Sequence, residues 1–463
     1  MKRLRCVEPV VAVYSFASFL LFPLVQQYVY RRLWMDLTNS TYPSGDDGSR
    51  CGVNGSSNRS SSHEEVQRAA SLFSLHTELF SMVPSLAVTF LLVAYSDQCG
   101  RKITIVLPLV GSILYCCSFL AVSFFQLGLN WLIAASVASA LFGGIGTMLG
   151  GCFSYVADLC QDGQGRTLRI AGVDMVIGLL SGVASISSGY FVRAAGFNWP
   201  LFTSALCQFL NLLYAVLVLE ESRVPERSGE VTCRAAARGL LLGVRQLFVG
   251  GGHRRNVLLP VLMVTFALFS FSDIGSMSAI TLYELNEPLC WNEVLIGYGS
   301  ALSTIVFLTS FVGVLVLSRC ASDVTIVFIG MVSVTTGLVM IAFARTTLMM
   351  FLVRIPMLLG VMPFPVLRSM MSKVVSTSEQ GALFACVAFL ESLSGNVALA
   401  AFSSIYAATV AWYPGFTFLL AAALCFIPIV MLSIVKLIGP VDANETEPLL
   451  PGAETGDPVD PVA

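Results

Sequence analysis

Residues 74–124 read SLHTELFSMVPSLAVTFLLVAYSDQCGRKITIVLPLVGSILYCCSFLAVSF, two mostly apolar runs joined by a short charged turn. Each run has the roughly 20 residues that a helix needs to cross the ~30 Å hydrocarbon core of a bilayer. The apolar residues are continuous and do not alternate with polar ones, so the pattern excludes a membrane β-barrel. The stretch therefore predicts two consecutive membrane helices connected by a hydrophilic turn.

The rest of the chain repeats this pattern. Its 463 residues are 56% hydrophobic and 12% charged, with a mean hydropathy of +0.80, whereas an average soluble domain is about 45–50% apolar and about 25% charged. This composition excludes a single soluble globular protein and a disordered chain, and the balance of 26 basic against 28 acidic residues excludes a nucleic-acid binder. Hydropathy predicts twelve membrane helices, near residues 9–29, 74–96, 103–124, 129–157, 170–192, 198–219, 257–283, 293–317, 323–344, 346–367, 382–409 and 414–437.

The twelve predicted helices form two groups of six, which predicts an all-α membrane protein with two six-helix bundles. A weak echo between GQGRTLRIAG (163–172) and SEQGALFACV (378–387), six helices apart, is typical of duplicated halves. Three prolines within 346–367 predict a kinked helix, and the glycines of 129–157 and 170–192 predict close helix contacts. The expected organisation is a cytosolic N-terminus (1–8), a first bundle (9–219) with a luminal loop (30–73), a cytosolic linker (220–256), a second bundle (257–437) and a disordered cytosolic tail (438–463).

Lysine and arginine are distributed unequally between the two faces of this layout. If the N-terminus is cytosolic, the cytosolic segments contain Arg101, Lys102, Arg368 and the arginines of the linker, while the short luminal loops contain only Arg193 and Arg345. Because positively charged short loops stay cytosolic, both termini are predicted to be cytosolic. The first apolar run has no small-residue cleavage site, so it is predicted to be a retained helix and not a signal peptide.

The predicted luminal loop supports this orientation. It carries three N-glycosylation sequons, at Asn39, Asn54 and Asn58, which require luminal exposure. Of the 13 cysteines, only Cys51 and Cys290 fall on the luminal side, and two lone thiols in an oxidising compartment are expected to form a disulfide. The sequence has no Cys-x-x-Cys pattern and no Cys/His cluster, so we expect no metal site.

Ionisable residues inside membrane helices are costly and therefore indicate function. A proton-coupled carrier needs a shielded carboxyl group that binds a proton on the acidic side and releases it on the neutral side. Arg354 needs an anionic partner, either Glu391 of the next helix or the acid group of a substrate. Each of these charges also has a structural interpretation, as an ion pair or an interfacial residue. The candidates are Asp174, Glu391 and Asp273 for proton coupling, and Arg354, Glu78 and His76 for substrate binding.

The turn between the second and third helices contains Asp97-Gln-Cys-Gly100-Arg101-Lys102. Gly100 permits a tight turn, and Asp97 is able to pair with Arg101 or to cap the next helix. The pattern Asp-x-x-Gly-Arg-Lys at this position resembles the signature of the major facilitator superfamily, although Val93 replaces its leading glycine. Together with the six-plus-six layout, it predicts that fold.

Longer strings resemble solute carrier family 46, the proton-coupled folate transporter family, over nearly all of residues 5–437. Four further strings are most similar to its lysosomal branch: QYVYRR (27–32), WNEV (291–294), LRSM (367–370) and AWYPGF (411–416). The family strings are VEP (7–9), VAD (156–158), TLYEL (281–285), PLCW (288–291), IGYGS (296–300) and EQGALF (379–384).

The resemblance implies proton symport and roles for particular residues. Asp174 takes the position of the family's proton-coupling acid, and Arg368 that of an arginine linked to proton and substrate binding. Cys51 and Cys290 take the positions of an interloop disulfide. Asp273 stands where the folate carrier has a histidine, and Gly144 where it has an aspartate, which argues against folate as the substrate.

The C-terminal tail contains Glu445-Thr-Glu-Pro-Leu449-Leu450. An acidic residue four positions before a dileucine resembles the signal that clathrin adaptors bind when they sort proteins to lysosomes. The leading hypothesis is thus a lysosomal symporter that exports small amphipathic organic anions, such as steroid conjugates, bile acids or drug catabolites, with the proton as coupling ion and no cofactor.

The sequence leaves alternatives to this hypothesis. Folate-like, muropeptide or cyclic-dinucleotide solutes are alternative cargoes. A membrane receptor or scaffold that keeps the carrier fold without transport is an alternative of another class. The sequence shows no filter loops or charge rings that would indicate a channel, and no Ser-His-Asp, zinc or nucleotide motif that would indicate an enzyme.

Overall fold

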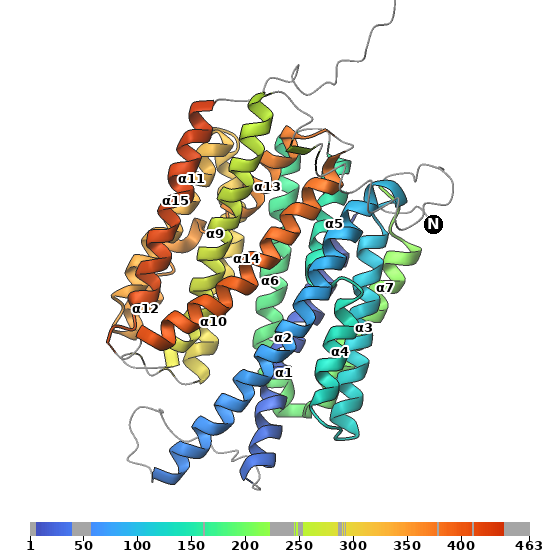
Figure 1. The fold of residues 1–463 in the computed structure, drawn as a ribbon, viewed down its shortest axis with the longest axis vertical. Helices are drawn as coiled ribbons and strands as arrows, with labels where there is room; N and C mark the ends of the chain where they lie inside the picture. The colour runs from blue at the N-terminus through green and yellow to red at the C-terminus, as the bar shows by residue number, and fades with distance from the viewer. Residues whose placement is uncertain are drawn as a thin grey trace, which may run out of the picture.

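The structure is a computed structural model, and its regular elements are helices (Figure 1). Among the residues that it describes, eleven helical segments are long and apolar enough to cross a membrane, and Leu302–Leu317 adds a shorter apolar one. This agrees with the predicted twelve spans. The described residues are 6–38, 57–160, 163–222, 245, 247–248, 253–285, 289, 291, 293–376, 379–409 and 412–438.

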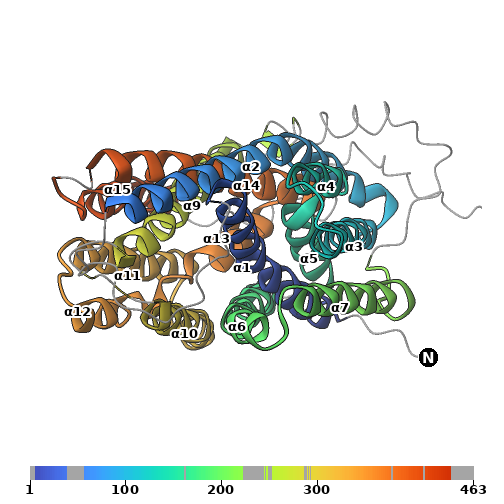
Figure 2. The same cartoon turned by 90° about the horizontal axis from the view of Figure 1, so that it is seen from below.

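The helices form two groups that lie side by side, as the view along the bundle axis shows (Figure 2). The first half contains α1 (Glu8–Thr38), α2 (Ser57–Cys99), α3 (Ile103–Phe124), α4 (Asn130–Ala140), α5 (Gly144–Leu159), α6 (Gly163–Ala195) and α7 (Asn198–Leu217). The second half contains α9 (His253–Leu285), α10 (Glu293–Leu317), α11 (Asp323–Ala342), α12 (Thr347–Leu352), the 3-10 turn η1 (Pro356–Leu359), α13 (Pro363–Val374), α14 (Gln380–Thr409) and α15 (Phe416–Ile438). The start of α1 and the end of α15 lie at the same end of the molecule, at the top of Figure 1.

Two helices extend beyond their predicted ends. Hydropathy ends the first span at residue 29 and begins the second at 74, but α1 continues to Thr38 and α2 begins at Ser57. A hydropathy window detects only the part of a helix that lies in hydrocarbon, so it misses polar turns that continue outside. The predicted loop 30–73 is therefore helical at both of its ends.

Two spans are interrupted within the membrane. The fourth span breaks between α4 and α5, where Gly143 and Gly144 have φ angles of +104° and +55°, values that favour glycine. The carbonyl of Gly143 accepts hydrogen bonds from the side chains of Thr147 and Thr89, at 2.7 and 3.2 Å. The tenth span is divided into α12, η1 and α13 at Pro356 and Pro363, as its prolines predicted.

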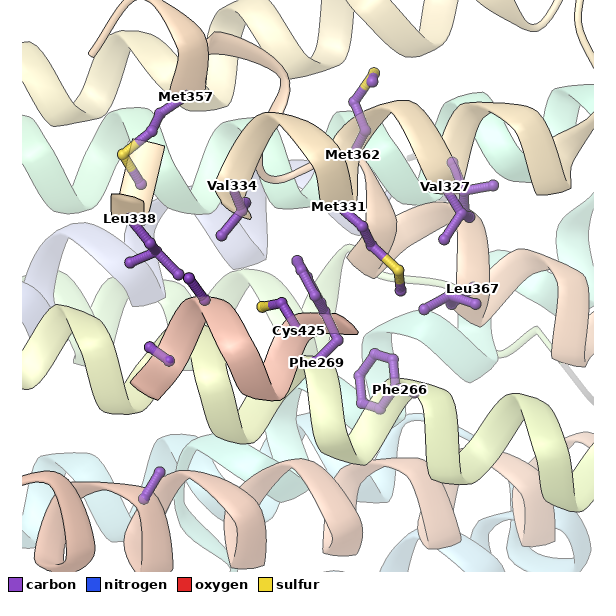
Figure 3. Close-up of a cluster of buried hydrophobic side chains, with 14 of the residues drawn as sticks. Phe266, Phe269, Val327, Met331, Val334, Leu338, Met357, Met362, Leu367 and Cys425 are labelled. Atoms are coloured by element: carbon purple, nitrogen blue, oxygen red, sulfur yellow. The ribbon is translucent and has the colours of Figure 1, made fainter. Parts of the chain in front are cut away.

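Close packing organises the second half. A buried cluster joins α9, α11, α13 and α15, and includes Phe266, Phe269, Met331 and Leu367 (Figure 3). Gly337 of α11 permits the close approach of Met357, because a Cβ at this position would lie 2.2 Å from Cγ of Met357. The predicted glycine contacts also occur, since Gly178 and Gly182 of α6 pack against Phe307 and Thr304 of α10. Small residues of this kind let membrane helices approach closely, where packing replaces the hydrophobic driving force.

Candidate functional site

A cavity of about 490 Å³ lies between the two halves. The first half contributes residues of α2, α4 and α5 and Tyr115 of α3, and the second half contributes residues of α14 together with Arg368 of α13 and Ile274 of α9. Arg368 is the only cation among the described residues that line the cavity, and Glu78 and Glu391 are the only acids. The volume is within the range of about 300–1,000 Å³ that is usual for small-molecule sites.

Arg368 joins two carboxylates that come from different halves. Its Nη1 donates to Oδ2 of Asp174 on α6 at 2.8 Å, and its Nη2 donates to Oε1 of Glu391 on α14 at 2.6 Å. The arginine side chain is 3% exposed, against 12% for Asp174 and 25% for Glu391. Charge-assisted bonds of this kind are strong where water is excluded, so the three groups act as one unit.

Aromatic rings surround the guanidinium of Arg368. Its Cζ lies 4.4 Å from the ring centroid of Phe153 in the first half, and 5.3 and 5.8 Å from those of Phe266 and Phe364 in the second. Such cation–π contacts favour the charge in an otherwise apolar site. The Nε atom of Arg368 is buried and has no hydrogen-bond partner within the described part of the chain.

Arg368 is deeper in the membrane than the sequence predicted. Hydropathy ends the tenth helix at residue 367 and places Arg368 in a cytosolic loop, whereas the span covers Thr347–Val374. The physical reason is that polar residues after Leu367, among them Arg368, Ser369 and Lys373, lower the hydropathy, although α13 continues to Val374 and buries Arg368.

The three predicted proton-coupling acids have different positions. Glu391 lines the cavity. Asp174 does not, and it reaches the cavity through Arg368, with which it is paired. Asp273 lies on α9 apart from this cluster, and its carboxylate forms no ion pair with any described residue, although the next residue, Ile274, lines the cavity.

Arg354 does not pair with Glu391, one of the two anionic partners that the sequence offered for it. Arg354 instead approaches Glu284, with 3.7 Å between Nη2 and Oε1, and both side chains are buried. Neither lines the cavity. The backbone of Trp291 fixes the end of α9 here by donating to the Glu284 carbonyl at 2.8 Å. Glu284 was missed because hydropathy ended its helix at residue 283, although the family string TLYEL contains it.

Of the two remaining residues predicted to bind substrate, one lines the cavity and the other does not. Glu78 lines the cavity from α2. His76, two residues earlier on the same helix, is exposed and is not among the lining residues.

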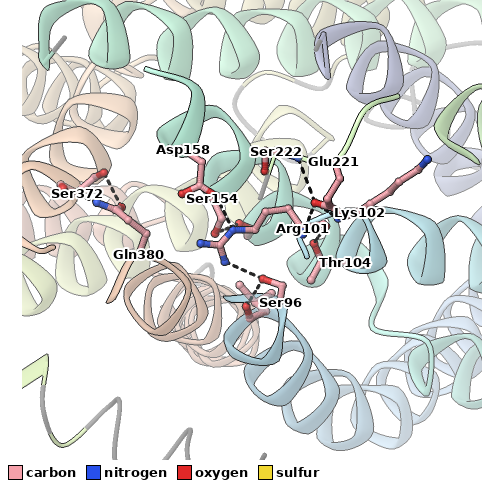
Figure 4. A network of polar contacts seen from close by, with 12 residues as sticks. Ser96, Arg101, Lys102, Thr104, Ser154, Asp158, Glu221, Ser222, Ser372 and Gln380 are labelled. Atoms are coloured by element: carbon pink, nitrogen blue, oxygen red, sulfur yellow. Dashed lines mark hydrogen bonds and ion pairs between the residues drawn. The ribbon is translucent and has the colours of Figure 1, made fainter. Parts of the chain in front are cut away.

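The turn between α2 and α3 forms a polar network (Figure 4). Arg101 is fully buried, and its side chain donates to Asp158 Oδ2 and to Ser96 Oγ, each at 2.8 Å. Glu221 accepts the backbone N–H groups of Arg101 and Lys102 at the start of α3, at 2.6 and 3.2 Å. The sequence singled out Arg101 and Gly100 here, but it did not identify Asp158 or Glu221 as partners, because both are distant along the chain. The backbone of Asp97 belongs to α2, and its side chain lies outside the described residues.

We expect Gly100→Ala to destabilise the folded protein by about 2 kcal/mol through its positive φ and the added methyl group. Gly100 has φ +98°, and a Cβ would lie 2.6 Å from the carboxylate of Glu221. The thermal unfolding midpoint of the purified protein in detergent measures the effect. Gly196→Ala is the matched control, because Gly196 has φ +71° with no atom within 4 Å. Equal shifts for both variants would contradict the contribution of Glu221.

The two halves are bonded to each other at this end of the molecule. Arg166 of α6 donates from Nη1 to the carbonyl and the hydroxyl of Ser372 of α13, both at 3.1 Å. Thr167 and Ser369 share a hydroxyl hydrogen bond of 2.5 Å. Gln380 also bonds to Ser372, so the two echoing segments of the sequence meet at one serine. These bonds hold the two halves together at this end.

Several predicted features lie outside the described residues. They are Cys51, Cys290, Asn39, Asn54 and the tail signal Glu445, Leu449 and Leu450. Asn58 is in the first turn of α2, but its side chain is not described.

Comparison with known proteins identifies the class. A model of the Major Facilitator Superfamily matches residues 9–322. The crystal structure of the human organic anion transporter MFSD10 aligns with a TM-score of 0.69 at 17% identity, covering 92% of this chain and 97% of that one. The proton:xylose symporter XylE aligns with a TM-score of 0.61 at 12% identity, covering 92% and 95%. The fold and its central cavity are those of a Major Facilitator Superfamily transporter.

Relatives with higher sequence identity show to which family of this superfamily the chain belongs. The chain is 45% identical over 432 residues to the lysosomal proton-coupled steroid conjugate and bile acid symporter SLC46A3 of Gallus gallus, covering 93% of each chain, and 43% identical over 432 residues to that of Homo sapiens, covering 93% and 94%. It is 32% identical over 437 residues to the proton-coupled folate transporter of Rattus norvegicus, covering 94% and 92%. The chain belongs to solute carrier family 46. It is a multi-pass membrane transporter and not an enzyme.

Proposed function

We propose that this transporter is a lysosomal proton-coupled symporter that exports small amphipathic organic anions from the lumen to the cytosol by alternating access. The observation that carries the proposal is the position of Arg368, the only cation lining the described cavity, between the two acids Asp174 and Glu391. Such a cluster links the binding of an anion to the binding of protons.

The charge of the cluster explains this link. With both carboxylates ionised, the cluster has a net charge of −1 and repels an anion. One proton makes it neutral, and a second proton leaves the guanidinium as its only charge. Because opposite charges at a few ångströms attract strongly in a shielded site, the protonated cluster binds an anionic group and the deprotonated cluster releases it. An acidic lumen therefore favours loading, and a neutral cytosol favours release.

The cavity wall suits an amphipathic solute. Leu86, Leu149, Phe153 and Val387 provide apolar surface for a hydrocarbon skeleton. Hydroxyl and amide groups, which orient a ligand without a large charge, complete the wall: Ser81, Ser85, Ser136, Ser139, Ser392 and Asn396. Relatives named for steroid conjugates and bile acids support this cargo class, since those compounds combine an apolar skeleton with an acid group.

Location and orientation are part of the proposal. The relatives with 42–45% identity are named as lysosomal, and the concentration of lysine and arginine on one side favours cytosolic termini. Within this orientation, Asn39, Asn54 and Asn58 would be glycosylated in the lumen, Cys51 would pair with Cys290, and the tail signal would bind a clathrin adaptor. The bonds of Arg166 and Thr167 on α6 to Ser372 and Ser369 on α13 then hold the two halves together at the cytosolic end and have to break during transport.

Two alternatives follow from the same fold. Folate-like, muropeptide or cyclic-dinucleotide solutes would use the same arginine, and the 32% identical folate transporter favours the first of these. A receptor without transport would bind an anion in the cavity and not release it across the membrane.

Purified protein in sealed lipid vesicles tests the proposal. We expect uptake of a radiolabelled steroid sulfate when the compartment containing the solute is acidic, and loss of accumulation when a proton ionophore dissipates the gradient. Uptake that is indifferent to the gradient would disprove proton coupling. Saturable binding without any uptake would support the receptor.

A further inference from the structure

The cavity contains a second acid, Glu78, whose role is separate from the Arg368 cluster. Glu78 is exposed on α2 and lines the same cavity as Arg368. Among the described residues, its carboxylate has no hydrogen-bond or ion-pair partner. An acid without a cation beside it leaves an uncompensated negative charge in this part of the cavity.

Glu78 and the Arg368 cluster lie at opposite ends of the cavity. Thr89 of α2 and Ser392 of α14 are at one level, because a Cβ on Gly146 would lie 3.4 Å from Thr89 Oγ1 and 2.8 Å from Ser392 Oγ. Ser392 directly follows Glu391, the partner of Arg368. Eleven residues of the continuous helix α2 separate Thr89 from Glu78, which is about 16 Å along the helix axis. Glu78 is therefore displaced toward the start of α2, at the lower end of Figure 1.

The wall between the two ends is neutral. On the first half it presents the hydroxyls of Ser81, Ser85, Ser136 and Ser139, and on the second half it is mainly apolar, with Val387, Ala388 and Gly395. A solute that spans the cavity therefore meets a cation at one end, an anion at the other and no charge in between.

We infer that Glu78 is a specificity-determining residue that selects elongated solutes with one anionic end and one end that is a hydroxyl or an ammonium group. The anionic end contacts Arg368, and the other end donates to the Glu78 carboxylate or remains close to it. A solute with anionic groups at both ends places one of them against Glu78 and is rejected. This inference rests on the proposed function, since it requires that Arg368 binds the first anionic group.

The test compares two probes of the same length in vesicles with an acidic donor side. One is a steroid with a sulfate ester at one end and a hydroxyl at the other, and the second is the same steroid sulfated at both ends. The measured quantity is the ratio of bis-sulfate to monosulfate uptake. We expect Glu78→Gln to raise this ratio about fivefold, the effect of removing one unit charge a few ångströms away in a water-accessible site. Glu78→Lys should raise it further.

Asp36→Asn is the matched control. Asp36 is an exposed acid on α1, paired with Arg32 and absent from the cavity wall, so its replacement should leave the ratio unchanged. The inference is overturned if Glu78→Gln leaves the ratio unchanged while the native protein transports the monosulfate, or if Asp36→Asn changes it equally. Failure of the native protein to transport the monosulfate would overturn the proposed function, and the inference with it.

Discussion

Replacement of Arg368 by glutamine is expected to reduce anion uptake at least 100-fold. The change removes the only cation that lines the described cavity, and it leaves two carboxylates facing each other without the group that bridges them at 2.8 and 2.6 Å. A hydrogen bond to a charged group contributes about 1.5–3 kcal/mol, and about 1.4 kcal/mol changes an equilibrium tenfold. Initial rates of steroid sulfate uptake at a fixed pH gradient measure the loss.

The variant Arg368→Lys distinguishes the effect of the positive charge from the effect of the guanidinium geometry. Lysine keeps the positive charge, but its single ammonium does not reproduce the fork that contacts two carboxylates at once. We expect uptake between that of the native protein and that of Arg368→Gln. Native uptake by Arg368→Gln would show that the anion binds elsewhere.

Asp174→Asn is expected to weaken the coupling of transport to the pH gradient by one proton. The amide cannot be protonated, so one of the two protons that alter the cluster charge is lost. Each coupled proton contributes about 100-fold accumulation for a gradient of two pH units, because one unit corresponds to about 1.36 kcal/mol. Accumulation should therefore fall by about this factor, while exchange of labelled for unlabelled solute at equal pH persists. Steady-state accumulation and exchange in vesicles are the two measurements.

Asp273→Asn provides the comparison that identifies the proton site. Asp273 is also an intramembrane acid, but it is remote from the ion pairs that the described residues form around Arg368. If its replacement uncouples transport and that of Asp174 does not, the assignment to Asp174 is wrong. Asp36→Asn, outside the cavity, controls for the removal of any one acid.

Much of the fold was predictable because a membrane imposes a length and a composition on each span. The apolar runs identified all twelve spans, and the prolines of the tenth span predicted its interruption. The break at Gly143 and the polar extension of α2 were not predicted, since both depend on local hydrogen bonds and not on hydropathy. Thr89 and Thr147, which bind the Gly143 carbonyl, become neighbours only when α2 packs against α5.

The sequence identified the individual residues of the site, but it did not predict which of them contact one another. Asp174 and Glu391 came from the rarity of buried charge, and Arg368 from the family resemblance, which also supported Asp174. Their assembly could not be predicted, because it depends on how far η1 shifts α13 and so on which arginine of the tenth span faces α14. The sequence offers Glu391 as one of two partners for Arg354, but Glu391 pairs with Arg368, and Arg354 approaches Glu284, which lies just beyond the predicted end of its helix.

Arg368 has partners on both sides of the boundary between the halves. Asp174 and the ring of Phe153 belong to the first half. Glu391 and the rings of Phe266 and Phe364 belong to the second half. Arg368 moves with the second half, so any rotation that parts the halves at this level breaks its bonds to Asp174 and Phe153 and preserves the others. An ionised Asp174 thus resists this rotation through its ion pair with Arg368. The proton that neutralises Asp174 weakens the ion pair and so favours the separation of the halves. Protonation of Asp174 then favours both the binding of the anion and the movement of the two halves.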